Sequence, residues 1–135
     1  METFQSSIIN ENDILLALSS TNKLIKSLPF SEIDRQKVFV SISELTRNVI
    51  MHAQGVGEFI CEVNDKGVTI IVKDRGIGIK SVSDVMSGIK NPNSQGLGLG
   101  LLGVKRLMDE FYIKSSEEGG TTVIVTKWIN HQYRK

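Results

Sequence analysis

The hydrophobic residues of this chain change their spacing near residue 54, and this change limits the folds that the chain can adopt. Before it, apolar side chains recur every three or four positions, as on one face of a helix; Val38, Ile42 and Val49 are examples. After it, apolar side chains alternate with polar ones, as in half-buried strands, beginning at Phe59. Helices followed mainly by strands predict an α+β domain.

Local signals place the expected elements along the chain. Asn12 or Asp13 can cap the first helix, Pro29 ends it, and Ser31 starts the second helix. In chain order we expect a strand over 2–9, helices over about 13–28 and 31–54, a hairpin over 58–72 with its turn at 64–67, a short helix from 81 or 83 to 86, a loop over 88–100, a helix over about 99–110, and a hairpin with strands over 111–115 and 121–128. The predicted fold is one domain over residues 1–135, a two-layer sandwich with a mixed, mostly antiparallel sheet and helices on one face, followed by a polar tail at about 130–135.

Composition excludes several classes of function. The chain has 135 residues, with 16 Lys+Arg against 15 Asp+Glu, and this near-neutral balance argues against a nucleic-acid binder. No apolar run approaches the roughly 20 residues of a membrane span, and the N-terminus lacks the features of a signal peptide, so we expect a cytoplasmic protein. The single cysteine, Cys61, lies among apolar residues and is expected to be a buried small hydrophobe.

A carboxylate and a carboxamide share one face of the predicted second helix. Glu44 and Asn48 are four residues apart and therefore neighbours on the helix surface. A carboxamide oxygen suits Mg²⁺ when phosphates complete the coordination shell, and a carboxylate can accept a proton from an attacking hydroxyl. A solvated polar edge of the helix is the plain structural alternative.

An aspartate and two glycines follow the predicted strand that ends near residue 74. In the sequence Asp74-Arg75-Gly76-Ile77-Gly78, the aspartate offers an acceptor that would bind the exocyclic amino group of adenine and repel the carbonyl of guanine. The two glycines allow the backbone to pass close to a ligand. A tight turn between elements is the alternative explanation.

A third segment is rich in glycine and runs into a helix. Its glycines are Gly96, Gly98, Gly100 and Gly103. Backbone N–H groups at a glycine-rich entry to a helix can bind an anion such as a phosphate. The segment fits neither a P-loop nor a dinucleotide-binding fingerprint, because it lacks a Gly-Lys-Ser/Thr sequence and does not follow a strand. A close-packed glycine connection is the alternative.

In this order and at these intervals, the three segments resemble the GHKL ATPase superfamily, which has the Bergerat ATP-binding fold. From about residue 14 to 128 the chain looks more closely like the RsbT-type serine/threonine kinases, through three segments: 43–48, 98–111 and 118–128. The resemblance implies ATP and Mg²⁺ as cofactors.

The resemblance also implies a role for individual residues. Glu44 would be the general base, Asn48 would ligate Mg²⁺, and Arg47 matches a basic position beside them. Asp74 would bind the adenine amino group, Gly76 and Gly78 would shape that wall, and the hydroxyl of Thr121 would support the adenine site. Four glycines would form the lid and the phosphate-binding helix entry: Gly96, Gly98, Gly100 and Gly103.

The activity implied is transfer of the ATP γ-phosphoryl group to a serine or threonine of STAS-domain partner proteins, in a bacterial partner-switching module that controls the stress response. A PP2C-type phosphatase, activated by direct binding, is the second implied partner. The main alternative is an ATP-dependent anti-sigma factor that sequesters a sigma subunit. A nucleotide-binding adaptor without transfer activity is disfavoured because Glu44 and Asn48 are both present.

Overall fold

The computed structural model describes residues 2–52, 56–75, 100–116 and 120–129. In chain order, the elements of this part are β1 (Glu2–Ile8), α1 (Glu11–Ile25), α2 (Glu32–His52), β2 (Gly57–Val63), β3 (Gly67–Asp74), α4 (Gly100–Leu107), β4 (Glu110–Ser116) and β5 (Gly120–Trp128). The helix predicted from 81 or 83 to 86 and the loop over 88–100, apart from Gly100, lie outside the described residues.

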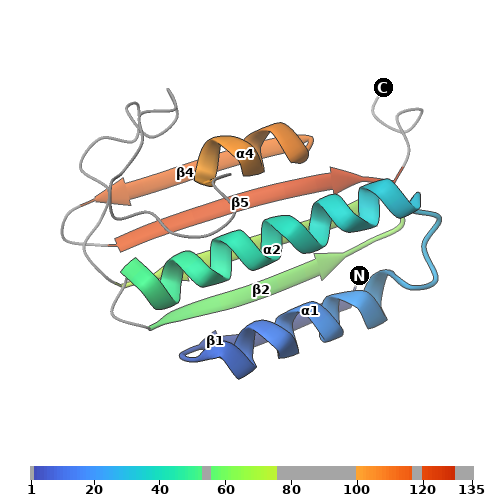
Figure 1. Ribbon diagram of the computed structural model, residues 1–135. Coiled ribbons are helices and arrows are strands. Elements are labelled where there is room, and N and C mark those ends of the chain that lie inside the picture. The colour runs from blue at the N-terminus through green and yellow to red at the C-terminus, as the bar shows by residue number, and fades with distance from the viewer. Residues whose placement is uncertain (1, 53–55, 76–99, 117–119, 130–135) are drawn as a thin grey trace.

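The strands form one sheet with the order β1-β2-β3-β5-β4, and the helices pack on one of its faces (Figure 1). Each neighbouring pair in this sheet is antiparallel. The α+β two-layer fold with a mostly antiparallel sheet and helices on one face is therefore confirmed. Strand β5 lies between β3 and β4 in the sheet, so β3 and β5 are neighbours although they are far apart in sequence.

The core lies between the sheet and the three described helices, because every second residue of a strand faces the helices. Residues paired across the strands share a face, and one such row crosses the sheet from Cys61 through Ile70 to Val125, each fully buried. Helix α2 adds Val38, Ile42, Leu45 and Val49 to this core. The apolar residues at helical spacing and those at alternating spacing thus pack together in one core.

Two helices differ from their predicted bounds. Helix α1 is capped by Asn10, not by Asn12 or Asp13, because the Asn10 side chain accepts hydrogen bonds from both of those backbone amides. The Asp13 carboxylate in turn accepts from the Asn10 amide, which completes a capping box. The helix ends at Ile25, before the predicted stop at Pro29, and α4 ends at Leu107, short of the predicted limit near residue 110.

Cys61 is fully buried on β2, as its neighbours in the sequence indicate. Burial raises the pKa of the Cys61 thiol from 9.0 to about 11. The thiol is therefore protonated near neutral pH and packs as a small apolar side chain. Among the helices described, none is both long enough and apolar enough to cross a membrane.

Candidate active site

The C-terminal half of α2 carries the first pair of predicted site residues. Glu44 is 5% exposed, and Asn48, one turn further on, is half-buried. Between them Thr46 is fully buried, and its hydroxyl donates a 2.7 Å hydrogen bond to the Ile42 carbonyl. Within the described residues, the Glu44 carboxylate has no hydrogen-bond or ion-pair partner. At 5% exposure, Glu44 lies at the edge of the core and not on a solvated edge of the helix.

Close packing at Gly57 brings this half of α2 to the end of the sheet that carries Asp74. Gly57 pairs with Asp74 across β2 and β3. A Cβ atom at Gly57 would lie 2.5 Å from a Val49 methyl group and 2.6 Å from the Lys73 carbonyl oxygen. Val49 follows Asn48 directly in α2, so the absence of a side chain at Gly57 lets α2 settle onto the strand ends. Figure 1 shows the C-terminal end of α2 over the end of the sheet where β5 begins.

Asp74 is held by the beginning of β5. Its Oδ1 accepts a hydrogen bond of 3.2 Å from the Thr121 backbone N–H. Gly120, at φ +75°, lies against the Asp74 carbonyl, and a Cβ at this position would overlap that carbonyl oxygen. Asp74 and Thr121, 47 residues apart in sequence, are therefore joined at one end of the sheet.

The Thr121 hydroxyl has a partner that the sequence pattern did not reveal. Its Oγ1 lies 2.8 Å from the Ser115 Oγ, across the β4–β5 pair in which these two residues are register partners. The contact with Asp74 is made by the Thr121 amide, and the hydroxyl is ordered by Ser115. Counting back along the predicted hairpin from Thr121 would have identified Ser115, because residues paired across antiparallel strands share a face.

The glycine-rich segment enters the described structure at the first residue of α4. Gly100 has φ +56° and is exposed, whereas Gly103 is buried within the helix. α4 lies along β4 and β5, with Gly100 toward the end of the sheet where β5 begins (Figure 1). The remaining predicted glycines, Gly76, Gly78, Gly96 and Gly98, lie outside the described residues.

Arg47 is a partly exposed residue on α2, between Glu44 and Asn48. Its guanidinium lies 3.7 Å from the Glu11 carboxylate, at the start of α1, and the two side chains are 39% and 72% exposed. An ion pair this exposed contributes little to stability. Arg47 therefore remains available on the surface beside Glu44 and Asn48.

The residues brought together can perform two separate tasks. At the strand ends, Asp74 offers an acceptor whose position is set by backbone contacts to β5. On α2, Glu44 and Asn48 offer a proton acceptor and a neutral oxygen ligand one turn apart. An apolar groove lined by Ile33, Val40 and Leu107 lies along the first half of α2 and is separate from these residues.

A family model and several relatives match most of the chain. A family model described as the histidine kinase-like ATPase domain matches residues 12–127. The serine/threonine-protein kinase RsbT of Bacillus subtilis is 39% identical over 127 residues, which are 90% of this chain and 93% of the relative. An anti-sigma F factor of Clostridium novyi is 34% identical over 97 residues, which are 67% of this chain and 68% of the relative.

A solved structure has the same fold. The crystal structure of the RsbU and RsbW domains of a Mycobacterium tuberculosis protein superposes with a TM-score of 0.66 at 19% identity. The match covers 94% of this chain and 32% of that longer one.

Proposed function

The chain belongs to the histidine kinase-like ATPase domain family, and from that premise we propose that it is an ATP-dependent protein serine/threonine kinase. Its substrates are STAS-domain proteins of a partner-switching module in the bacterial stress response, and it also binds and activates a PP2C-type phosphatase. The similarity to a serine/threonine-protein kinase along 90% of the chain supports this function. The site that we propose for it is built from the described residues and from the glycines of the sequence.

The observation that carries the proposal is the position of Glu44. Glu44 is 5% exposed, its carboxylate has no partner among the described residues, and it lies one helical turn from Asn48. The Gly57 contact places this part of α2 at the sheet end that holds Asp74. In phosphoryl transfer from ATP to a hydroxyl, a proton acceptor can orient the attacking oxygen, and an acceptor for the base can hold the nucleotide nearby.

Asp74 recognises the base in this proposal. Its carboxylate accepts a hydrogen bond from the adenine amino group and disfavours guanine, whose carbonyl would face it. The Thr121 amide and the Gly120 backbone keep the carboxylate in place. In this proposal the Thr121 hydroxyl, which contacts the Ser115 hydroxyl, supports the adenine site. Gly76 and Gly78 form the adjoining wall.

The phosphate end is formed by α2 and α4. The carboxamide oxygen of Asn48 is a hard, neutral donor that fits Mg²⁺, an ion which takes few protein ligands when phosphates complete its shell. When bound, Mg²⁺ neutralises charge on the phosphates. Gly96, Gly98, Gly100 and Gly103 present backbone amides at the start of α4, where the helix dipole favours an anion. Arg47 supplies positive charge from the surface of α2.

Glu44 performs the proton step. The carboxylate orients the substrate serine or threonine hydroxyl and accepts its proton as the oxygen bonds to the γ-phosphorus. The bond from that phosphorus to the β–γ bridging oxygen breaks, and ADP leaves.

A second function is favoured by a specific observation. The similarity to an anti-sigma F factor at 34% identity makes sequestration of a sigma subunit the alternative. That match covers 67% of the chain, against 90% for the kinase. The longer match favours the kinase as the principal activity.

The direct test is incubation with ATP labelled at the γ-phosphate, together with candidate STAS-domain proteins. We expect label on a serine or threonine of one of them. A sigma factor that co-purifies with the chain while every STAS-domain protein stays unlabelled would favour the alternative.

The matched variant for this test is Glu44→Gln, which keeps the shape and removes the base. We expect transfer to fall by a factor on the order of 10² to 10⁴, with ATP affinity kept. Transfer at the wild-type rate would exclude Glu44 as the base.

A further inference from the structure

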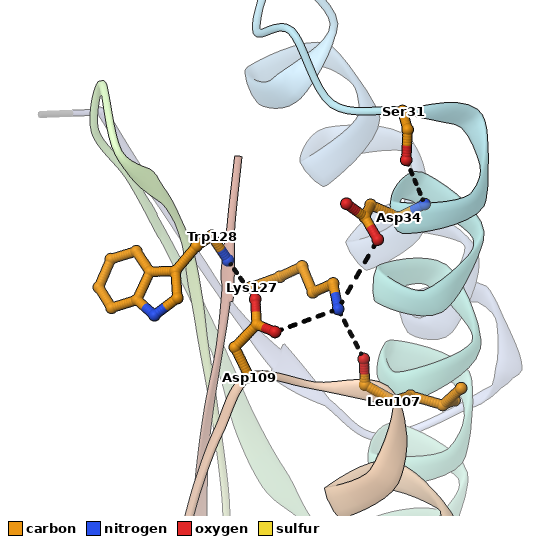
Figure 2. A network of polar contacts seen from close by, with 6 residues as sticks. All are labelled: Ser31, Asp34, Leu107, Asp109, Lys127 and Trp128. Carbon is orange, nitrogen blue, oxygen red and sulfur yellow. Dashed lines mark hydrogen bonds and ion pairs between the residues drawn. The ribbon is translucent and has the colours of Figure 1, made fainter. Parts of the chain in front are cut away.

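A lysine occupies a core-facing position near the end of β5. Thr121, Val123 and Val125 face the helices, and Lys127 continues their alternation. Lys127 is 5% exposed, so its aliphatic stem and its ammonium group are both removed from water. Buried charges require partners, and Figure 2 shows where this ammonium finds them.

The Lys127 ammonium contacts three groups from two other parts of the chain. Its Nζ donates a 3.0 Å hydrogen bond to the Leu107 carbonyl and lies 3.4 Å from the Asp109 Oδ1. The Asp34 Oδ1, on the first turn of α2, is 3.7 Å away. We call Lys127, Asp34, Asp109 and the Leu107 carbonyl the Lys127 cluster.

The acidic members of the cluster have further contacts that fix their place in the fold. The second oxygen of Asp109 accepts a 2.8 Å hydrogen bond from the Trp128 N–H. The Asp34 N–H donates to the Ser31 hydroxyl at the start of α2. One ammonium therefore ties together the beginning of α2, the end of α4 and the end of β5 (Figure 2).

The cluster acts on the helix whose other end enters the proposed phosphate site. Leu107, which accepts the Lys127 hydrogen bond, is the last residue of α4, and Gly100 is the first. Eight helical residues span about 12 Å, a length over which a helix behaves as a rigid rod. Val104 is fully buried in the middle of this rod. Fixing the Leu107 end therefore fixes the direction in which the amides at the Gly100 end point.

We propose that Lys127 is a positioning residue for the nucleotide phosphates. It touches no nucleotide and acts by holding the C-terminal end of α4, so that the N-terminal amides of α4 are oriented for an anion before ATP arrives. This inference rests on the proposed nucleotide site. It predicts that loss of the cluster weakens contacts to the phosphates and spares contacts to the base, because Asp74 is held by β5 residues at the opposite end of that strand.

The test compares two ligands on the whole chain. Lys127→Met keeps the length of the side chain and removes its charge. ATP binding is measured by titration calorimetry, and adenosine binding by ligand-observed NMR. We expect the ATP affinity to fall at least tenfold and the adenosine affinity to stay within twofold of wild type.

Cys61→Ala is the control for a general loss of stability. It removes a buried group from β2, and Cys61 lies outside the Lys127 cluster. We expect it to lower stability and to leave both affinities unchanged. Should Lys127→Met fail to fold, Asp34→Asn loosens the same cluster more mildly and is expected to weaken ATP at least threefold while sparing adenosine.

Two failures can be distinguished. Equal loss of ATP and adenosine affinity, or no loss of either, in the Lys127→Met or Asp34→Asn protein would overturn the positioning role alone. A wild-type chain that binds no ATP in the presence of Mg²⁺ would instead overturn the proposed function on which the inference rests.

Discussion

Replacing Gly120 with alanine tests the contact that orders the proposed adenine site. Gly120 has φ +75°, a region that costs an L-residue about 1–2 kcal/mol. The new Cβ would also overlap the Asp74 carbonyl group and lie 3.0 Å from the Arg75 Cα. These are backbone atoms, which cannot swing aside as a flexible side chain can.

The expected cost follows from these two terms and one offset. Overpacking of this kind costs about 1–3 kcal/mol, and the reduced entropy of the unfolded chain returns about 0.4–1 kcal/mol. Gly120→Ala should therefore lower the free energy of unfolding by about 1–5 kcal/mol. Gly100→Ala is the matched control, because Gly100 has φ +56° but a Cβ added there would meet no atoms within 4 Å; it should cost about 1 kcal/mol.

Urea unfolding followed by fluorescence measures both variants. Trp128 is the single tryptophan of the chain and ends β5, the strand that Gly120 begins. A shift in midpoint with an unchanged slope reports a change in stability. If the two variants differed by less than about 0.5 kcal/mol, the overlap with Asp74 would contribute nothing, and the argument that β5 positions this carboxylate would be refuted.

Two further predictions concern single side chains. Asp74→Asn keeps an oxygen for the Thr121 N–H but can present an amide donor to the adenine amino group, so calorimetry should show ATP affinity about 10- to 100-fold lower and a smaller preference for ATP over GTP; unchanged affinity for both would move the base site elsewhere. The raised pKa of Cys61, from 9.0 to about 11, means that above pH 9 the unfolded thiol ionises while the folded thiol does not. Stability should thus fall between about pH 9 and 11 by up to about 3 kcal/mol, an effect missing in Cys61→Ala, and an equal fall in both proteins would contradict it.

Much of the fold could be predicted from local patterns in the sequence. The change of hydrophobic period located the helices and strands, since the side of an element that meets the core is set by its repeat. Errors fell at helix ends. Asn10 competes with Asn12 and Asp13 for the cap of α1, and the choice depends on which backbone amides its side chain can reach.

The candidate site could be predicted where its residues are neighbours on one element. Glu44 and Asn48 share a helix face whatever the rest of the fold is, because residues four apart on a helix are neighbours. Ser115 was missed although it is the register partner of Thr121, since the motif that singles out the threonine hydroxyl carries no information about the pairing across the hairpin.

The sequence by itself determined the kinds of element, the order of the motifs and the chemistry that each motif offers, because these depend on residues close together in the chain. Tertiary structure alone decided which motifs meet. Val49 packs against Gly57, which brings α2 to the strand ends, and the pairing of β3 with β5 joins Asp74 to Thr121. It also decided that Lys127 stays charged at the core-facing position that the alternation of β5 gives it. Its partners Asp34 and Asp109 come from distant parts of the chain and offset the cost of burying its charge.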